Sequence, residues 1–216
     1  MASTSVDRSK SWRRWRWVLA AGVVVALIGL GLVLSGSRDA SLDPDTVIFG
    51  DSVTYLTGGA LNNRFDHPHI VARYGFPTAD LLPLVRQVFA QGVPSRVAVL
   101  AGYNDVFRST VDSGALPEMM RETARADCVV WLTLPARTGG TAAPSPPYDP
   151  ALVRLWNGRI EKLAARYPNV HVVHDWQKLV NRDASDLLED RGVHPLAPGQ
   201  RRLADVYRKG LDRSCR

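Results

Sequence analysis

Five short apolar runs, rich in β-branched residues, alternate with amphipathic stretches from about residue 39 onward, and this alternation constrains the fold most. The runs predict strands at Thr46–Phe49, His69–Arg73, Arg96–Ala101, Cys128–Leu134 and Val170–His174. Parallel strands need crossover connections, which are usually helices. The pattern therefore predicts an α/β fold in which strand-helix units build one parallel sheet.

Apolar residues between these strands recur at helical spacing and predict the faces that helices bury. One helix presents Leu81, Leu82, Val85, Val88 and Phe89, and a second presents Leu152, Leu155, Trp156, Ile160 and Leu163. The second begins at Asp149, an N-cap residue followed by Pro150. A last helix, Pro198 to Asp212, carries Leu203, Val206, Tyr207 and Leu211 on one stripe.

Three turns carry side chains able to act as a nucleophile, a hydrogen-bond donor and a base. Ser52 follows the first strand in Gly50-Asp51-Ser52, where a hydroxyl near a helix amino-terminus suits a nucleophile. Asn104 follows the third strand in Gly102-Tyr103-Asn104-Asp105, and its amide can donate to an oxyanion. His194, in Val193-His194-Pro195 just before the last helix, supplies a base near neutral pH. Taken singly, the first two turns are ordinary turn chemistry.

Together, in this order, these turns resemble the SGNH (GDSL-type) hydrolase family over residues 45–212. Ala164–Trp176 also resembles exported actinobacterial members, including those fused to membrane acyltransferases. The resemblance implies a three-layer α/β/α sandwich with a five-stranded parallel, flavodoxin-like sheet. It also implies that Ser52 is the nucleophile, His194 its base, and Ser52 N–H, Gly75 N–H and Asn104 the oxyanion donors.

The acid that orients the histidine departs from the family pattern. In the family it usually stands three residues before the histidine, but that position is Arg191 here and Asp190 stands four before. We expect a one-residue bulge at Gly192 to bring Asp190 to His194, because glycine tolerates the backbone angles of a bulge. The alternative is a serine-histidine dyad of lower rate, or a site that binds without turnover.

These residues predict an esterase that forms an acyl-serine intermediate on an O-acetyl or short-chain ester, without a cofactor. The substrate is expected to be an acylated small molecule or glycan. Two alternatives stay open: an O-acyltransferase that passes the acyl group to a cell-envelope glycan, and a non-catalytic carbohydrate-binding module. We expect no metal site, since His171 and His174 alternate faces of a strand.

Most of the net positive charge of the chain lies in its amino-terminal tail and not in the predicted folded domain. Residues 1–16 hold +4 of the net charge of +6, and Trp17–Ser35 follows as 19 uncharged residues. At ~1.5 Å per residue such a helix spans roughly the 30 Å membrane core, and bases before it favour a cytoplasmic amino-terminus. We expect a basic tail at 1–16, a transmembrane helix at 17–35, a linker at 36–44 and an extracytoplasmic domain at 45–216. A cleaved signal peptide is the alternative, and nucleic-acid binding is not expected.

Two further features bear on the domain. Cys128 opens the fourth strand and Cys215 follows the last helix, so in this fold both are expected at the edge opposite the catalytic turns, where a disulfide is expected in an oxidising exterior; two unrelated thiols are the alternative. Pro135–Pro150 follows the fourth strand and is too rich in glycine and proline for a helix. This loop is expected at the ligand-binding rim, as a lid or a surface insertion.

Overall fold

A five-stranded parallel sheet forms the centre of the part of the chain that the structure describes. The computed structural model describes residues 46–140, 147–190 and 192–215. The strands are β1 (Thr46–Gly50), β2 (His69–Ala72), β3 (Arg96–Leu100), β4 (Cys128–Leu132) and β5 (Val170–Val173). Their spatial order is β2-β1-β3-β4-β5, the flavodoxin-like order, and every pairing is parallel. The predicted sheet is thereby confirmed.

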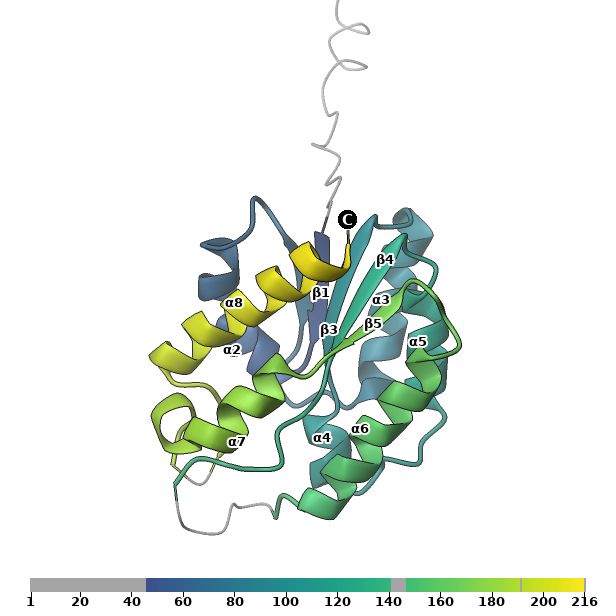
Figure 1. Cartoon of the computed structure of the whole chain (residues 1–216). Coiled ribbons are helices and arrows are strands. Elements are labelled where there is room, and N and C mark those ends of the chain that lie inside the picture. Colours follow the sequence, from purple (N-terminus) through teal and green to yellow (C-terminus); the bar gives the residue numbers. More distant parts are fainter. Residues whose placement is uncertain (1–45, 141–146, 191, 216) are drawn as a thin grey trace, which may run out of the picture. The chain divides into compact units, whose positions relative to one another are not determined.

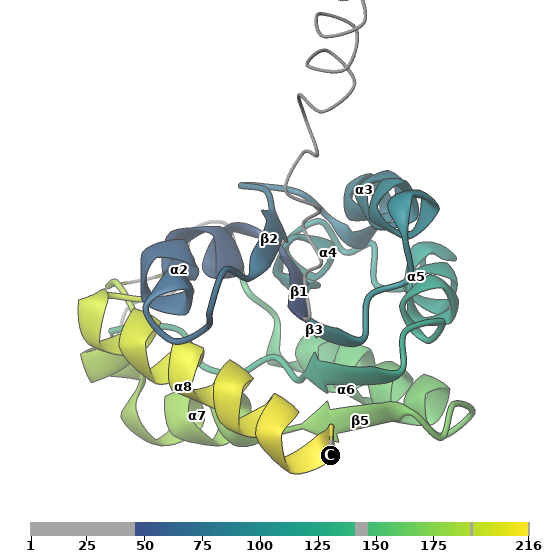
Figure 2. The ribbon, with the colours of Figure 1, turned by 90° about the horizontal axis from the view of Figure 1, so that it is seen from above.

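Helices cover both faces of the sheet, which gives three layers (Figures 1 and 2). One face carries α2 (Ser52–Asn62), α7 (Asp175–Leu187) and α8 (Ala197–Ser214). The other carries α3 (Thr78–Gln91), α5 (Ala115–Thr123) and α6 (Pro150–Ala164), with the short α4 (Tyr103–Phe107) at the carboxyl end of β3. Because both faces are covered, every residue of β1 is buried, which explains why its sequence is a continuous apolar run.

The register of the sheet sets where the functional turns begin. Gly50, the last residue of β1, pairs with Ala72 at the end of β2 and with Leu100 at the end of β3. The three strands therefore end level, and the segments that follow them leave from one edge. Neighbouring carboxyl ends in an open α/β sheet form the usual ligand-binding edge of such folds.

The predicted helical stripes hold with one exception, Leu155. This side chain lies on the solvent side of α6 and is 45% exposed, whereas Val153 is fully buried. The buried stripe of α6 runs through Val153, Trp156 and Ile160, and the Trp156 indole donates to the carbonyl of Ala101 at 3.1 Å. The buried face of α6 is therefore rotated by a fraction of a turn from the face that the sequence predicts. Its predicted start is confirmed, since the Asp149 carboxylate accepts from Ala151 N–H.

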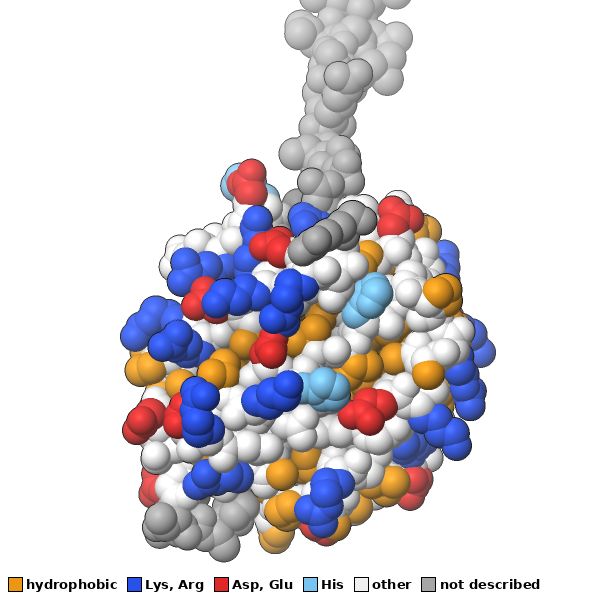
Figure 3. All heavy atoms as spheres, in the orientation of Figure 1, with side chains coloured by type: hydrophobic (Ala, Val, Ile, Leu, Met, Phe, Trp, Pro, Cys, Tyr) orange, Lys and Arg blue, Asp and Glu red, His pale blue; other side chains and the backbone are white. Residues whose placement is uncertain are grey.

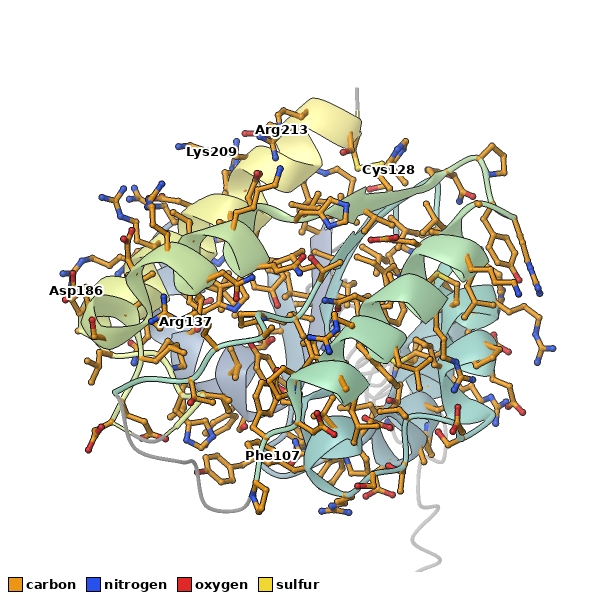
Figure 4. All side chains as sticks on the ribbon, turned by 60° about the horizontal axis from the view of Figure 1, so that its bottom comes forward. Phe107, Cys128, Arg137, Asp186, Lys209 and Arg213 are labelled. Atoms are coloured by element: carbon orange, nitrogen blue, oxygen red, sulfur yellow. A yellow bond between two sulfur atoms is a disulfide. The ribbon has the colours of Figure 1, made fainter. Side chains whose placement is uncertain are left out.

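A disulfide joins Cys128 to Cys215, as predicted. Their Cα atoms lie 5.5 Å apart and they are separated by 87 positions in the sequence. The bond ties the start of β4 to the end of α8, at the edge where the strands begin (Figures 1 and 4). A cross-link that closes a loop of this length is worth about 4.6 kcal/mol in the chain-entropy account.

The predictions for the amino-terminal part fall on residues 1–45, which lie outside the described residues. The basic tail, the transmembrane helix at 17–35 and the linker at 36–44 therefore stay predictions. Among the helices that the structure describes, none combines the length and apolarity needed to span a bilayer.

Two buried carboxylates connect the segments that follow β1, β2 and β3 at the carboxyl edge. Asp51 is fully buried; its Oδ1 accepts from Val53 N–H and its Oδ2 from Tyr103 N–H, both at 3.2 Å. It therefore joins the turn after β1 to the turn after β3. Asp105 is 1% exposed, and its Oδ2 accepts from Thr78 N–H at 2.9 Å. That bond joins the turn after β3 to the segment that follows β2.

Burial changes the proton affinity of both carboxylates. It raises the pKa of Asp51 from 3.8 to about 7, against the opposing effect of the backbone donors, and it also raises the pKa of Asp105. A carboxyl group whose pKa is higher in the folded state binds more protons there than in the unfolded chain. The contribution of such a group to the free energy of unfolding is fully present below its pKa in the unfolded chain, and it is lost as the pH rises through its pKa in the folded state.

We therefore predict that Asp51 makes the free energy of unfolding fall between about pH 4 and pH 7. An Asp51→Asn variant keeps an acceptor oxygen but cannot ionise. Its free energy of unfolding should therefore fall less over this range than that of the wild type, by up to about 4 kcal/mol. Urea unfolding of both proteins at several pH values measures the difference. The exposed Asp80→Asn variant is the matched control and should follow the wild type. Identical pH dependence in wild type and Asp51→Asn would contradict the prediction.

Candidate active site

Ser52 and His194 are in contact although 142 positions separate them in the sequence. Ser52 is the first residue of α2, and its Oγ lies 3.0 Å from Nε2 of His194. The N–H groups of a first helical turn have no partner within the helix, and the helix dipole places partial positive charge there. The hydroxyl of Ser52 is therefore paired with a base at a helix end that favours negative charge.

The carboxylate on the other side of the imidazole belongs to Glu189. Its Oε1 lies 2.7 Å from Nδ1 of His194. With the proton on Nδ1 facing this carboxylate, Nε2 is free to accept the proton of the Ser52 hydroxyl. Our expectation that Asp190 makes this contact is corrected: Asp190 lines the same cleft, but the contact with Nδ1 is made by its neighbour.

The backbone between residues 188 and 195 explains why Glu189 reaches the histidine. Leu188 and Pro195 form an antiparallel bridge, and Glu189 N–H donates to the carbonyl of His194 at 2.9 Å. Glu189 and His194 are therefore opposite each other across a narrow turn. Gly192 has a different role from the one expected: a Cβ there would lie 2.3 Å from Oε1 of Glu189, so glycine leaves room for the carboxylate.

Asn104 and Gly75, the predicted oxyanion donors, lie on neighbouring turns. The Asn104 side-chain amide donates to the carbonyl of Phe76 at 3.2 Å, which leaves its second N–H for another acceptor. Gly75 has φ +76°, a conformation that disfavours L side chains, although a Cβ would meet no atom within 4 Å. Its glycine is therefore required by backbone conformation and not by crowding. The Arg108 guanidinium donates to the carbonyl of Gly75 at 2.8 Å.

One cleft of about 730 Å³ brings all of these groups together at the carboxyl edge, which Figure 4 turns toward the viewer. Residues from the three turns and from the segment before α8 line it: Ser52, Tyr74, Gly75, Tyr103, Asn104, Phe107, Arg108, Glu189, Asp190, Gly192, Val193 and His194. The predicted residues Ser52, Gly75, Asn104 and His194 therefore share one cavity.

Tyr74 is a cleft residue that the sequence did not reveal. Its ring centre lies 5.1 Å from that of His194, its hydroxyl lies 3.5 Å from Nδ1, and 58% of the residue is exposed. Arg108 and Phe107 were also missed, because α4 ends in a sequence without a recognisable motif. Proximity to Gly75 and Asn104 in the chain was the available signal for these residues.

The loop after β4 lies beside the segment that carries Glu189 and His194. Gly139 N–H donates to the carbonyl of Gly192 at 2.9 Å, and Gly139 forms a parallel bridge with Asp190. Residues 141–146 are outside the described part of the loop. The described part thus borders the rim of the cleft, as the sequence predicted. Among the described residues, no three His, Cys, Asp or Glu side chains gather where they could hold a metal ion.

Solved structures share this fold at low sequence identity. The C-terminal catalytic domain of peptidoglycan O-acetyltransferase A from Streptococcus pneumoniae, solved with a methylsulfonyl adduct, has a TM-score of 0.62 at 17% identity, covering 78% of this chain and 93% of that one. A putative acylhydrolase from Bacteroides fragilis scores 0.64 at 19% identity, covering 79% and 88%. An acetylxylan esterase from Geobacillus stearothermophilus scores 0.59 at 20% identity, covering 77% and 93%.

The sequence itself identifies the family. A search of curated proteins finds no match. Residues 48–202, most of the chain, match the GDSL-like lipase/acylhydrolase family. This range contains the turns of Ser52, Gly75 and Asn104 and the segment of Glu189 and His194. The chain therefore belongs to the GDSL-like lipase/acylhydrolase family and is an ester hydrolase of the GDSL type.

Proposed function

We propose that this enzyme removes an O-acetyl or other short acyl group from a substrate outside the cell, through an acyl-serine intermediate. The observation that carries the proposal is the continuous contact from Ser52 through His194 to Glu189, beside donors on two further turns. A nucleophile, a base and an orienting acid in hydrogen-bond reach form the usual arrangement of a serine hydrolase.

In the proposed reaction, Nε2 of His194 takes the proton of Ser52 as Oγ attacks the ester carbonyl. The oxyanion accepts hydrogen bonds from Ser52 N–H, Gly75 N–H and Asn104 Nδ2. His194 then returns the proton to the leaving alcohol. Water, deprotonated by the same nitrogen, attacks the acyl-serine and releases the acid. The Glu189 carboxylate stabilises the imidazolium formed in each step.

The lining of the cleft supports a short acyl group on a polar alcohol. Arg108, Glu189 and Asp190 border the cleft and can hydrogen-bond to a polar alcohol such as a sugar. Tyr74 and Phe107 supply aromatic surface among these polar groups, which suits a sugar ring. A glycan O-acyl ester fits this combination.

The proposed extracytoplasmic location rests on two features. The disulfide between Cys128 and Cys215 is typical of oxidising compartments. The apolar segment Trp17–Ser35, preceded by bases, supports an exported type of enzyme with a membrane anchor or, as the alternative, a cleaved signal peptide.

An acyltransferase that uses a glycan hydroxyl in place of water is the second candidate. The shared fold with the O-acetyltransferase domain of Streptococcus pneumoniae favours including it. Both reactions have the same first half. We expect free acetate as the main product from an acetyl ester donor, with and without a glycan acceptor. Transfer of most of the acetyl groups to the acceptor would replace the hydrolase proposal by the transferase.

The nucleophile can be tested directly. We predict that a fluorophosphonate probe labels the full chain and that Ser52→Ala reduces labelling to background, because only an activated serine reacts with the probe. Ser185→Ala, which removes an exposed serine on α7, is the matched control and should label like the wild type. Undiminished labelling of a folded Ser52→Ala protein, or no labelling of the wild type, would favour a binding module instead.

The assignment of the acid is a separate prediction. Glu189→Gln keeps the size of the side chain but removes the charge that stabilises the imidazolium, so kcat for p-nitrophenyl acetate should fall by about 10²-fold or more. Asp190→Asn should change kcat by no more than a few-fold. Steady-state kinetics of the two variants decides between the two acids. A larger loss in Asp190→Asn than in Glu189→Gln would return the role to Asp190.

A further inference from the structure

A groove between α7 and α8 is strongly basic and lies apart from the active-site cleft. It has a volume of about 310 Å³, near the lower end of the usual range for ligand sites. Five cationic and two acidic side chains line it together with two apolar ones: Asp175, Lys178, Leu179, Arg182, Arg202, Asp205, Val206, Lys209 and Arg213. None of these residues lines the active-site cleft.

The cations form two rows along the groove. Lys178 and Arg182 are four residues apart on α7, and Arg202, Lys209 and Arg213 recur at intervals of seven and four on α8. Such spacing places each set on one face of its helix. Leu179 and Val206 contribute apolar surface between the rows. Figure 3 shows Lys and Arg gathered over these helices, and Figure 4 labels Lys209 and Arg213 on the same stretch of α8.

Both acidic residues of the groove form ion pairs with arginines. Asp205 pairs with Nε of Arg64 at 2.7 Å, and Asp175 pairs with Arg213. Arg182 pairs with Asp183, which lies outside the lining.

The other three cationic residues of the groove are exposed: Lys178, Arg202 and Lys209. No carboxylate of the described ranges lies within ion-pair distance of any of these three side chains. Like charges that face each other across a helix pair raise the free energy of the fold, and a bound anion removes this repulsion.

We propose that this groove binds a ligand that carries two or more phosphate groups. Arginine matches phosphate with a planar pair of donors, and lysine adds point charge. Arg202 and Lys209 are seven positions apart on α8, which at ~1.5 Å per residue separates them by roughly 10 Å along the helix, enough for more than one phosphate. The apolar surface of Leu179 and Val206 suits the carbon atoms between the phosphates.

The test compares two double variants of the full chain, kept in neutral detergent, with inorganic tripolyphosphate as the probe. Lys178→Ala/Lys209→Ala removes two groove charges, and Lys162→Ala/Arg166→Ala removes two charges at the end of α6 as the control. At constant ionic strength, we expect tripolyphosphate to raise the Tm of the wild type and of the control. The groove variant should bind at least tenfold more weakly in calorimetry, with a Tm without ligand no lower than that of the wild type.

Two arms identify the source of the phosphate. The second probe is diphosphatidylglycerol, a lipid with two phosphates, added to the same micelles. Binding of either probe to the wild type that is lost in the groove variant supports the proposal. The probe that binds more tightly than the other shows whether the ligand is soluble or lipid-borne. Binding of neither probe beyond the effect of equal ionic strength, or equal binding by the groove and control variants, overturns it. Ser52→Ala should bind as the wild type does, which separates this result from the fate of the esterase proposal.

Discussion

The hydrogen bonds that the buried carboxylate of Asp51 accepts from two turns are the constraint on which the active site depends. Ser52 and Asn104 lie on separate turns after β1 and β3, and neither turn alone fixes its distance to the other. Asp105 extends the connection to the segment after β2, next to Gly75. The level ends of three strands bring the turns to one edge, and the two carboxylates then determine how they face each other.

Residues whose role follows from local sequence could be predicted. The strands were predictable because their apolar runs are continuous. The turns of Ser52, Asn104 and His194 each lie beside a recognisable element, and their order along the chain carried the family resemblance, which implied their roles and that of Gly75. Glu189 could not be predicted in the same way. Its contact with His194 arises from pairing across a turn, and a count of positions before the histidine does not contain that information. The exposure of Leu155 shows a similar limit, since the apolar pattern of α6 fits two adjacent phases.

Helix α8 connects the two edges of the domain. It begins three residues after His194 and ends next to Cys215, whose disulfide holds it to the start of β4. Between these ends its buried side chains pack on the sheet, and its outer side contributes one row of the basic groove. One helix therefore supports the base of the active site, the covalent closure of the fold and a charged surface, with each task on a different part of its length.

The narrow turn from Leu188 to Pro195 has a consequence for how such enzymes diverge. The register of the turn, and not its length, presents the carboxylate to the imidazole. Residues inserted or deleted at the tip change the count between acid and histidine while the paired positions at its base stay opposite each other. In this chain the position opposite the histidine, and not a fixed count of residues, therefore identifies the acid.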